Sequence, residues 1–270
     1  MSIFGKVQCF FKEKFNSIKE FFTDNKKRTG FIAISSSVIL LILISLVGFG
    51  LYVSDYYHTD WLAIYREDNH SELYSIEEGE NGVVKFVPDE AKVGFIFYPG
   101  GKVEYSAYIP LMDALASRNV LCVLVEMPFN LAVLDVNAAD GITEDFPEIE
   151  HWYIGGHSLG GSMAASYLDT HTDTIDGVVL LAAYSTADLT DSRVLSIYGS
   201  NDGVMNREKY ESYKNNLPEG FTEKIIDGGN HAGFGMYGHQ AGDGSLEIST
   251  SEQIKQTADI ITAFVNNQGD

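Results

Sequence analysis

The sequence predicts an α/β domain, built on a mostly parallel central sheet with helices on both faces, that follows one transmembrane helix. Two observations lead to this prediction. Through the large C-terminal part of the chain, short apolar runs alternate with segments of helical periodicity. Near the N-terminus, the 23 residues 31–53 contain no Asp, Glu, Lys or Arg. The 270 residues suffice for one large domain with a short addition.

The formal net charge of −20 is unevenly distributed along the chain. Residues 1–30 hold seven Lys and Arg against three Asp and Glu, whereas the remainder holds eleven against 35. So acidic a chain lacks the cationic face that phosphate binding needs, which argues against nucleic acid as the main partner. Hydrophobic residues make up 45% of the chain and charged residues 21%, as in globular rather than disordered proteins.

The uncharged segment 31–53 is long enough, as a helix, to cross the hydrocarbon core of a bilayer. A buried core helix is usually shorter and seldom uncharged for about six turns. A cleaved signal peptide has a shorter basic region before it and a small-residue cleavage site after it, neither of which is present. We therefore predict a permanent anchor that contacts the lipid bilayer through residues 31–53.

The ends of this segment predict its orientation. Three basic residues at 26–28 precede it, and tyrosines and a tryptophan cluster with two aspartates around its end. The positive-inside rule then places the N-terminus in the cytoplasm and the domain outside it, as a single-pass protein of the cell membrane. Residues 1–30 also have an amphipathic pattern typical of a helix on anionic lipid, although a plain basic tail is the alternative. That pattern consists of Phe4, Val7, Phe11, Phe15, Ile18 and Phe22.

A linker and lead-in is expected over residues 54–81, and the α/β domain over residues 82–270. Strands are predicted at Val83–Val87, Val93–Tyr98, Val120–Glu126, His151–Gly155, Gly177–Ala182, Val194–Tyr198 and Glu223–Ile226. Helices are predicted at Ser106–Ser117, Asn130–Ala139, Leu159–Thr170, Asn206–Asn216 and Ser251–Val265. No internal repeat or second domain boundary is visible in this region.

One glycine-rich turn is the first candidate for chemistry. The pentapeptide at 156–160, Gly-His-Ser-Leu-Gly, fits G-x-S-x-G, in which two glycines permit a tight turn from strand to helix that projects the serine Oγ above the sheet. A phosphate loop is a rival explanation, but it fails because Gly161-Ser162 stands where Lys-Ser/Thr is required. A turn that only packs a helix onto a strand is the other alternative for this pentapeptide taken alone.

A serine nucleophile needs a base, and the base needs an orienting carboxylate. Asp202 follows the strand predicted at 194–198, and His231 follows the next strand along the chain. The order Ser158, Asp202, His231 is that of the α/β hydrolases, and residues 82–265 resemble the serine esterases and lipase-like members of that superfamily. The resemblance implies an α/β-hydrolase fold, with Ser158 as nucleophile, His231 as general base and then acid, and Asp202 holding the imidazole.

The resemblance also implies two backbone amides that stabilise an oxyanion. One is the amide of Leu159, the residue after the serine. For the other, Pro99-Gly100 stands where the family commonly has His-Gly, which gives Gly101 as the donor and Lys102 as the adjacent alternative.

The substrate site has fewer signals. Many relatives insert a lid after the strand predicted at 177–182, but only nine residues, 184–192, precede the next strand here, so a minimal cap or none is expected. Three residues are candidates for the pocket wall: Met127, Phe129 and Phe234. A place in the core is the alternative for the first two. The glycine-rich loop 232–250 is a candidate cover for the site, and a purely structural excursion is the alternative.

Together these features predict a membrane-anchored, extracytoplasmic serine hydrolase that acts on a carboxylic ester, a small-molecule or lipid-like substrate, through an acyl-serine intermediate. No cofactor is expected, and no metal site either, because no metal-ligand spacing such as H-E-x-x-H occurs. Two alternatives stay open. One is an envelope acyltransferase or peptidase with the same triad, and the other is a catalytically silent binding module.

Overall fold

The computed structural model describes residues 12–16, 19, 25–67, 73–79 and 82–267. The chain divides into two units, Met1–Ser54 and Asp55–Asp270.

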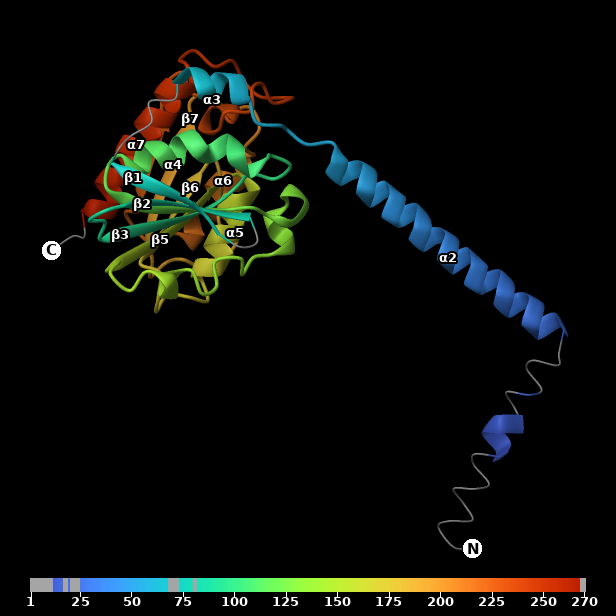
Figure 1. Cartoon of the computed structure of the whole chain (residues 1–270). Helices are drawn as coiled ribbons and strands as arrows, with labels where there is room; N and C mark the ends of the chain where they lie inside the picture. Colours follow the sequence, from blue (N-terminus) through green and yellow to red (C-terminus); the bar gives the residue numbers. More distant parts are fainter. Residues whose placement is uncertain (1–11, 17–18, 20–24, 68–72, 80–81, 268–270) are drawn as a thin grey trace, which may run out of the picture. The chain divides into compact units, whose positions relative to one another are not determined.

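Helix α2 (Asn25–Ser54) is the long helix of the first unit (Figure 1). Within it, Arg28–Ser54 has a mean hydropathy of 2.6, and no part of its apolar window is buried. Its 27 residues extend about 40 Å as a helix, more than the hydrocarbon core of about 30 Å. By length and composition, a membrane anchor and a signal sequence both have these properties. Of the residues in the amphipathic pattern of the tail, only Phe15 lies within the described residues, and it is exposed.

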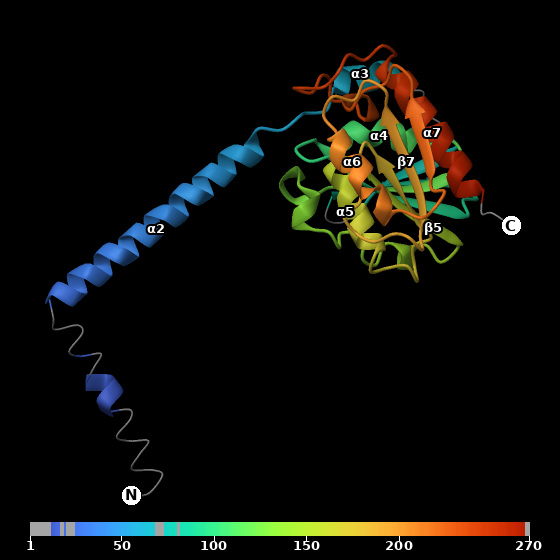
Figure 2. The ribbon, with the colours of Figure 1, turned by 180° about the vertical axis from the view of Figure 1, so that it is seen from behind.

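The second unit is built on a sheet in the order β1-β2-β4-β3-β5-β6-β7-β8 (Figures 1 and 2). β4, β3 and β5 to β8 are parallel, whereas β1 and β2 pair antiparallel at one edge. The strands are β1 (Tyr74–Glu78), β2 (Val83–Pro88), β3 (Val93–Tyr98), β4 (Val120–Val125), β5 (His151–His157), β6 (Gly177–Leu181), β7 (Arg193–Gly199) and β8 (Thr222–Ile226). The helices are α3 (Trp61–Glu67), α4 (Ile109–Ala116), α5 (Leu159–Leu168), α6 (Arg207–Tyr213) and α7 (Thr250–Asn266).

Both faces of the sheet are buried, which explains why its central strands are apolar throughout. Alternate side chains of β3 belong to two separate core clusters: Phe95 and Phe97 pack with α4 and α7, and Ile96 and Tyr98 pack with α5. The prediction of a mostly parallel sheet with helices on both faces is therefore confirmed. Because β5, β7 and β8 are parallel, the residues that follow them meet at one edge of the sheet.

The prediction of a helix at Asn130–Ala139 is wrong. The chain instead forms two short 3-10 turns, Pro128–Asn130 and Ala132–Leu134. Phe129 and Asn130 have φ values of 54° and 56°, which an α-helix does not permit. Tertiary contacts replace the helical hydrogen bonds: the hydroxyl of Tyr98 donates to the Val136 carbonyl and accepts from the Ala139 amide, each at 2.9 Å.

The stretch expected as a linker and lead-in, residues 54–81, contains regular structure that the sequence analysis did not predict. It holds α3 and the edge strand β1. β1 is largely exposed, so its residues include no apolar run by which a strand could be recognised. Its Tyr74 hydroxyl donates to the Asp113 carboxylate of α4, which attaches this edge to the body of the domain.

Candidate active site

Ser158 lies at the sharp turn between β5 and α5. Its backbone has φ 51° and ψ −117°, outside the regions that L-residues usually occupy. The Ser158 amide donates to the Leu181 carbonyl of β6 at 2.9 Å, and the Ser158 carbonyl accepts from the Ser162 amide at 3.2 Å. The strained turn is thus held from the sheet on one side and from the helix on the other.

The two glycines of the pentapeptide are required by close backbone contacts. A Cβ on Gly156 would lie 2.5 Å from the Tyr98 carbonyl oxygen, and a Cβ on Gly160 would overlap the carbonyl oxygens of Tyr98 and Pro99. The start of α5 therefore packs directly against the end of β3. This packing explains the glycines independently of any role for the serine between them.

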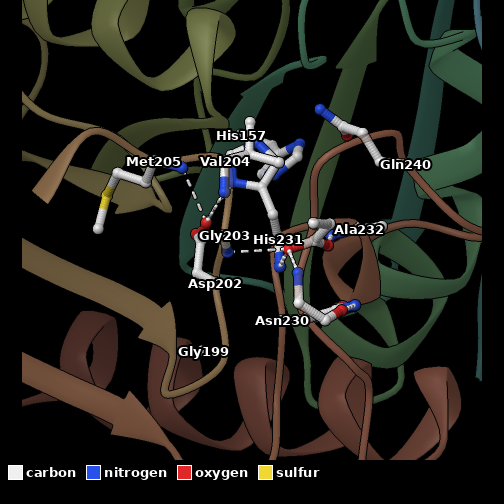
Figure 3. A network of polar contacts seen from close by, with 12 residues as sticks. His157, Gly199, Asp202, Gly203, Val204, Met205, Asn230, His231, Ala232 and Gln240 are labelled. Atoms are coloured by element: carbon white, nitrogen blue, oxygen red, sulfur yellow. Dashed lines mark hydrogen bonds and ion pairs between the residues drawn. The ribbon is translucent and has the colours of Figure 1, made fainter.

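Asp202 and His231 form a buried pair at the ends of β7 and β8 (Figure 3). The His231 Nδ1 lies 2.9 Å from Asp202 Oδ2, and the two side chains are 1% and 0% exposed. The other carboxylate oxygen, Oδ1, accepts hydrogen bonds from the Val204 and Met205 amides at 2.9 and 2.8 Å. The loop after β7 therefore wraps around the carboxylate and fixes its direction toward the imidazole.

Two opposing effects act on the Asp202 carboxyl. Burial alone would raise its pKa, but hydrogen bonds from His231 and from the amides of Met205 and Val204 lower the pKa below its usual value. The carboxylate is consequently ionised at neutral pH. An ionised carboxylate at Nδ1 favours the tautomer in which Nε2 of the imidazole is free to accept a proton.

Ser158 and His231 line the same cleft, of about 260 Å³. His231 Nε2 is buried and has no hydrogen-bond partner among the described residues. The other lining residues come from the starts of α5 and the loops after β6 and β7: Leu159, Ser162, Ala182, Ala183, Tyr184, Val204, Met205 and Asn206. Ser158 and the carboxylate-bound imidazole of His231 thus line one small cavity.

The loop after β3 contains the two candidates for a second oxyanion donor. The Lys102 amide is already engaged, because it donates to the Asn130 carbonyl at 2.7 Å. The preceding Gly100 amide donates to the Tyr108 hydroxyl at 3.1 Å. In contrast, the amides of Gly101 and Leu159 donate to no acceptor within the described part of the chain. A Cβ on Gly101 would lie 2.9 Å from the Leu159 side chain, so these two residues are neighbours.

His157 is a buried packing residue next to this site. Its Nδ1 lies 2.8 Å from the Tyr108 hydroxyl, and its ring centroid lies 4.4 Å from that of His231. Burial, followed by the neighbouring His231, lowers the pKa of His157 well below its usual value. The imidazole is therefore neutral and completes a chain of contacts from the Gly100 amide through Tyr108.

The three residues predicted as pocket wall do not line the cleft. Met127 and Phe234 are buried in the core, and Phe234 packs against His157 at a centroid distance of 5.6 Å. Phe129 is exposed, and its backbone has a positive φ. Val204 and Met205, which do line the cleft, lie two and three residues after Asp202, a proximity that could have identified them from the sequence.

The loop 232–250 lies mostly fixed against the domain. Residues 232–237 are buried, and the Met236 amide donates to the Ala107 carbonyl at 2.7 Å. Asp243 accepts hydrogen bonds from the backbone on both sides of the site. These contacts attach the loop to the body of the domain at both positions.

A larger cavity, of about 640 Å³, is remote from this chemistry. It is lined by the first residues of β7 and β8 and by the C-terminal half of α7, at the opposite end of the strands from Ser158. Among the described residues, no group of three or more His, Cys, Asp or Glu side chains is placed to hold a metal ion.

The fold and the turn at Ser158 define the class of protein as an α/β hydrolase. A family model described as the alpha/beta hydrolase family matches residues 94–255. This match covers more than half of the chain, and the protein therefore belongs to the alpha/beta hydrolase family. A search of curated protein sequences found no match.

Solved structures show the same fold. Est1E from Butyrivibrio proteoclasticus aligns with a TM-score of 0.51 and 12% identity, over 72% of this chain and 98% of that one. An alpha/beta hydrolase enzyme from the metagenome of sediments of the Mar Chica lagoon, Morocco, aligns with a TM-score of 0.53 and 16% identity, over 72% of this chain and 99% of that one. A membrane phospholipase A described as a novel bacterial virulence factor aligns with a TM-score of 0.55 and 11% identity, over 86% of this chain and 97% of that one. Identities this low establish the fold and nothing about the substrate.

Proposed function

We propose that this hydrolase cleaves carboxylic esters through an acyl-serine intermediate. The observation that supports it is the cleft that Ser158 and His231 both line. His231 Nδ1 is bound to the buried Asp202, and Nε2 has no hydrogen-bond partner among the described residues. In the proposed reaction, His231 Nε2 removes the Ser158 proton as Oγ attacks the ester carbonyl. The imidazolium then protonates the leaving alcohol, and water attacks the acyl-serine with His231 again as base.

We assign the oxyanion hole to the amides of Leu159 and Gly101. Both are free of acceptors in the described structure, whereas the Lys102 amide is bound to Asn130. The Leu159 amide also lies at the N-terminus of α5, where the partial positive charge of the helix supports a developing oxyanion.

Replacing Ser158 by Ala tests the nucleophile. We expect turnover of a short p-nitrophenyl ester to fall by about 10⁶-fold, since the triad acts as a unit. A fluorophosphonate probe should label the wild-type chain at Ser158 and leave the variant unlabelled. Undiminished hydrolysis by Ser158→Ala would contradict the proposal. The silent binding module predicts no labelling of either chain, and an acyltransferase or peptidase predicts that the acyl group passes to an added alcohol or amine.

We further propose that α2 anchors the enzyme in the cell membrane, with the N-terminus cytoplasmic and Asp55–Asp270 outside the cytoplasm. The apolar length of Arg28–Ser54 and the basic residues before it support this topology. Protease added to intact cells should degrade the catalytic domain, and protection from it until the cells are opened would contradict the proposed orientation. Retention of residues 1–54 in the membrane-bound protein distinguishes an anchor from a cleaved signal sequence.

A further inference from the structure

Asp243 lies in a glycine-rich turn, Gly242-Asp243-Gly244, a pattern typical of a loop. Its carboxylate nevertheless accepts four backbone hydrogen bonds. Oδ1 accepts from the amides of Gly203 at 3.0 Å, His231 at 3.2 Å and Gly244 at 2.8 Å. Oδ2 accepts from the Ala232 amide at 2.8 Å.

Two of these donors belong to the loop that carries His231, and one belongs to the loop that carries Asp202. Gly203 follows Asp202 directly, and Ala232 follows His231 directly. Figure 3 shows the segment of Asp202 and Gly203 next to the segment of His231 and Ala232. One side chain therefore binds the backbone of both loops at positions adjacent to the paired residues.

The segment around Asp243 is itself held in place by close backbone packing. The Asn201 side chain donates to the Ser245 carbonyl at 3.0 Å, and the Asn230 side chain donates to the Gly244 carbonyl at 2.9 Å. A Cβ on Gly244 would overlap the Asn201 carbonyl oxygen. The residues that follow Asp243 in the chain therefore bind the same two loops through additional hydrogen bonds.

We propose that Asp243 is a positioning residue for the Asp202–His231 pair: its carboxylate joins the two loops and fixes the distance between carboxylate and imidazole. This inference rests on the proposed function. Asp243 does not contact the reacting atoms, so its effect on turnover passes through the pair that it holds. Hydrogen bonds from amides to a charged oxygen are about twice as strong as neutral ones, which makes a carboxylate suited to this task.

The test compares Asp243→Asn and Asp243→Ala with Asp227→Asn in the full-length chain. Asp227 is exposed in the turn before the His231 loop, so its replacement removes one negative charge nearby without removing these hydrogen bonds. A displacement of reacting groups by about 1 Å costs about 100-fold in rate. We expect kcat on a short p-nitrophenyl ester to fall about 100-fold in Asp243→Ala and about tenfold in Asp243→Asn, which keeps one acceptor oxygen. KM should change little, and Asp227→Asn should match the wild type.

Amide hydrogen exchange gives a readout that does not depend on turnover. Asp243→Ala should accelerate exchange in peptides that contain Gly203, His231 and Ala232, and leave the rest of the domain at the wild-type rate. Equal kcat in Asp243→Asn, Asp243→Ala and Asp227→Asn would overturn the inference. Uniform acceleration across the domain would also overturn it, because it would indicate a general role in stability. If Asp243→Ala does not fold, Asp243→Asn decides by the same two measurements. Wild-type hydrolysis by Ser158→Ala would instead refute the proposed function, and the exchange comparison would still test whether Asp243 joins the loops.

Discussion

At the scale of single residues, Ser158 combines strain with support. Its backbone conformation, φ 51° and ψ −117°, costs on the order of 1–3 kcal/mol for a residue with a side chain. Such strain persists only where the surroundings hold it, as the hydrogen bonds to Leu181 and Ser162 do here. The serine is therefore presented to the cleft in a defined direction before any substrate arrives.

Asp202→Asn tests the carboxylate with almost no change in volume. At neutral pH, Asp202 is ionised because its hydrogen bonds lower its pKa. An amide in its place favours the tautomer of His231 with the proton on Nε2, where it cannot accept the serine proton. We expect kcat to fall by about 10⁴-fold. A steady-state assay that gives less than a tenfold loss would exclude Asp202 as the residue that orients the imidazole.

His157 makes the stability of the domain depend on pH. Its folded-state pKa is lowered by burial, so the unfolded chain, with the ordinary value of 6.5, binds the proton more tightly. The stability that the neutral imidazole contributes is fully present above pH 6.5 and is lost as pH falls below that value. We expect the unfolding free energy to decrease by up to about 1.4 kcal/mol per pH unit from this group.

The measurement for His157 is urea unfolding at pH 7.5 and 5.5 in the wild type and in His157→Gln, which keeps an acceptor for Tyr108. The difference between the two pH values should be smaller in the variant. His58→Gln serves as the control, because the His58 side chain is 68% exposed. An identical pH dependence in all three chains would contradict the account of His157.

At the scale of elements, the start of α5 lies directly on the end of β3. Gly160 permits this contact, since a Cβ there would overlap the carbonyl oxygens of Tyr98 and Pro99. The same contact sets the Leu159 amide beside the loop that contains Gly101. The geometry of the proposed oxyanion hole therefore depends on how the start of α5 packs against the end of β3.

Gly160→Ala should separate these elements. We expect a loss of about 1–3 kcal/mol in unfolding free energy from overpacking, together with a fall in kcat that exceeds the change in KM. Gly79→Ala is the matched control, because the nearest atoms to its Cβ would lie 3.4 Å away in ordinary contact. Thermal unfolding and ester hydrolysis of the two variants provide the comparison, and equal behaviour of both would refute the argument.

At the scale of the whole molecule, the catalytic domain carries its own core. Asp55–Asp270 forms a separate unit whose buried clusters lie on both faces of the sheet. The apolar surface of α2 belongs to the other unit. Folding of the domain and the proposed attachment to a membrane therefore have separate determinants in the chain.

Deletion of residues 1–54 should leave a domain that stays in solution without detergent and hydrolyses a soluble ester with kcat within about threefold of the full-length value, since no residue of the proposed mechanism is removed. Gel filtration and the ester assay measure both properties. Aggregation of the truncated chain in the absence of detergent would show that the first unit contributes to the fold of the second.

Elements whose residues carry a local pattern could be predicted from the sequence, and elements that depend on distant contacts could not. The strands over 93–98 and 120–125 could be predicted because burial on both faces makes them apolar throughout. The helix predicted at 130–139 failed because contacts of Tyr98 with distant backbone groups outweigh local helical preference. β1 was missed because an exposed edge strand has no apolar signature.

Periodicity, charge and glycine spacing are local properties of a chain, so the order of residues was enough to predict the class of fold, the apolar length of α2 and the candidates Ser158, Asp202 and His231. The folded structure was needed to show which amide after β3 has no acceptor among the described residues and that Met127 and Phe234 belong to the core. It was also needed to show that Asp243 joins two loops 40 and 12 residues away from it. Those facts depend on which backbone groups meet across the fold, and hydrogen bonds between distant loops leave no pattern in the order of residues.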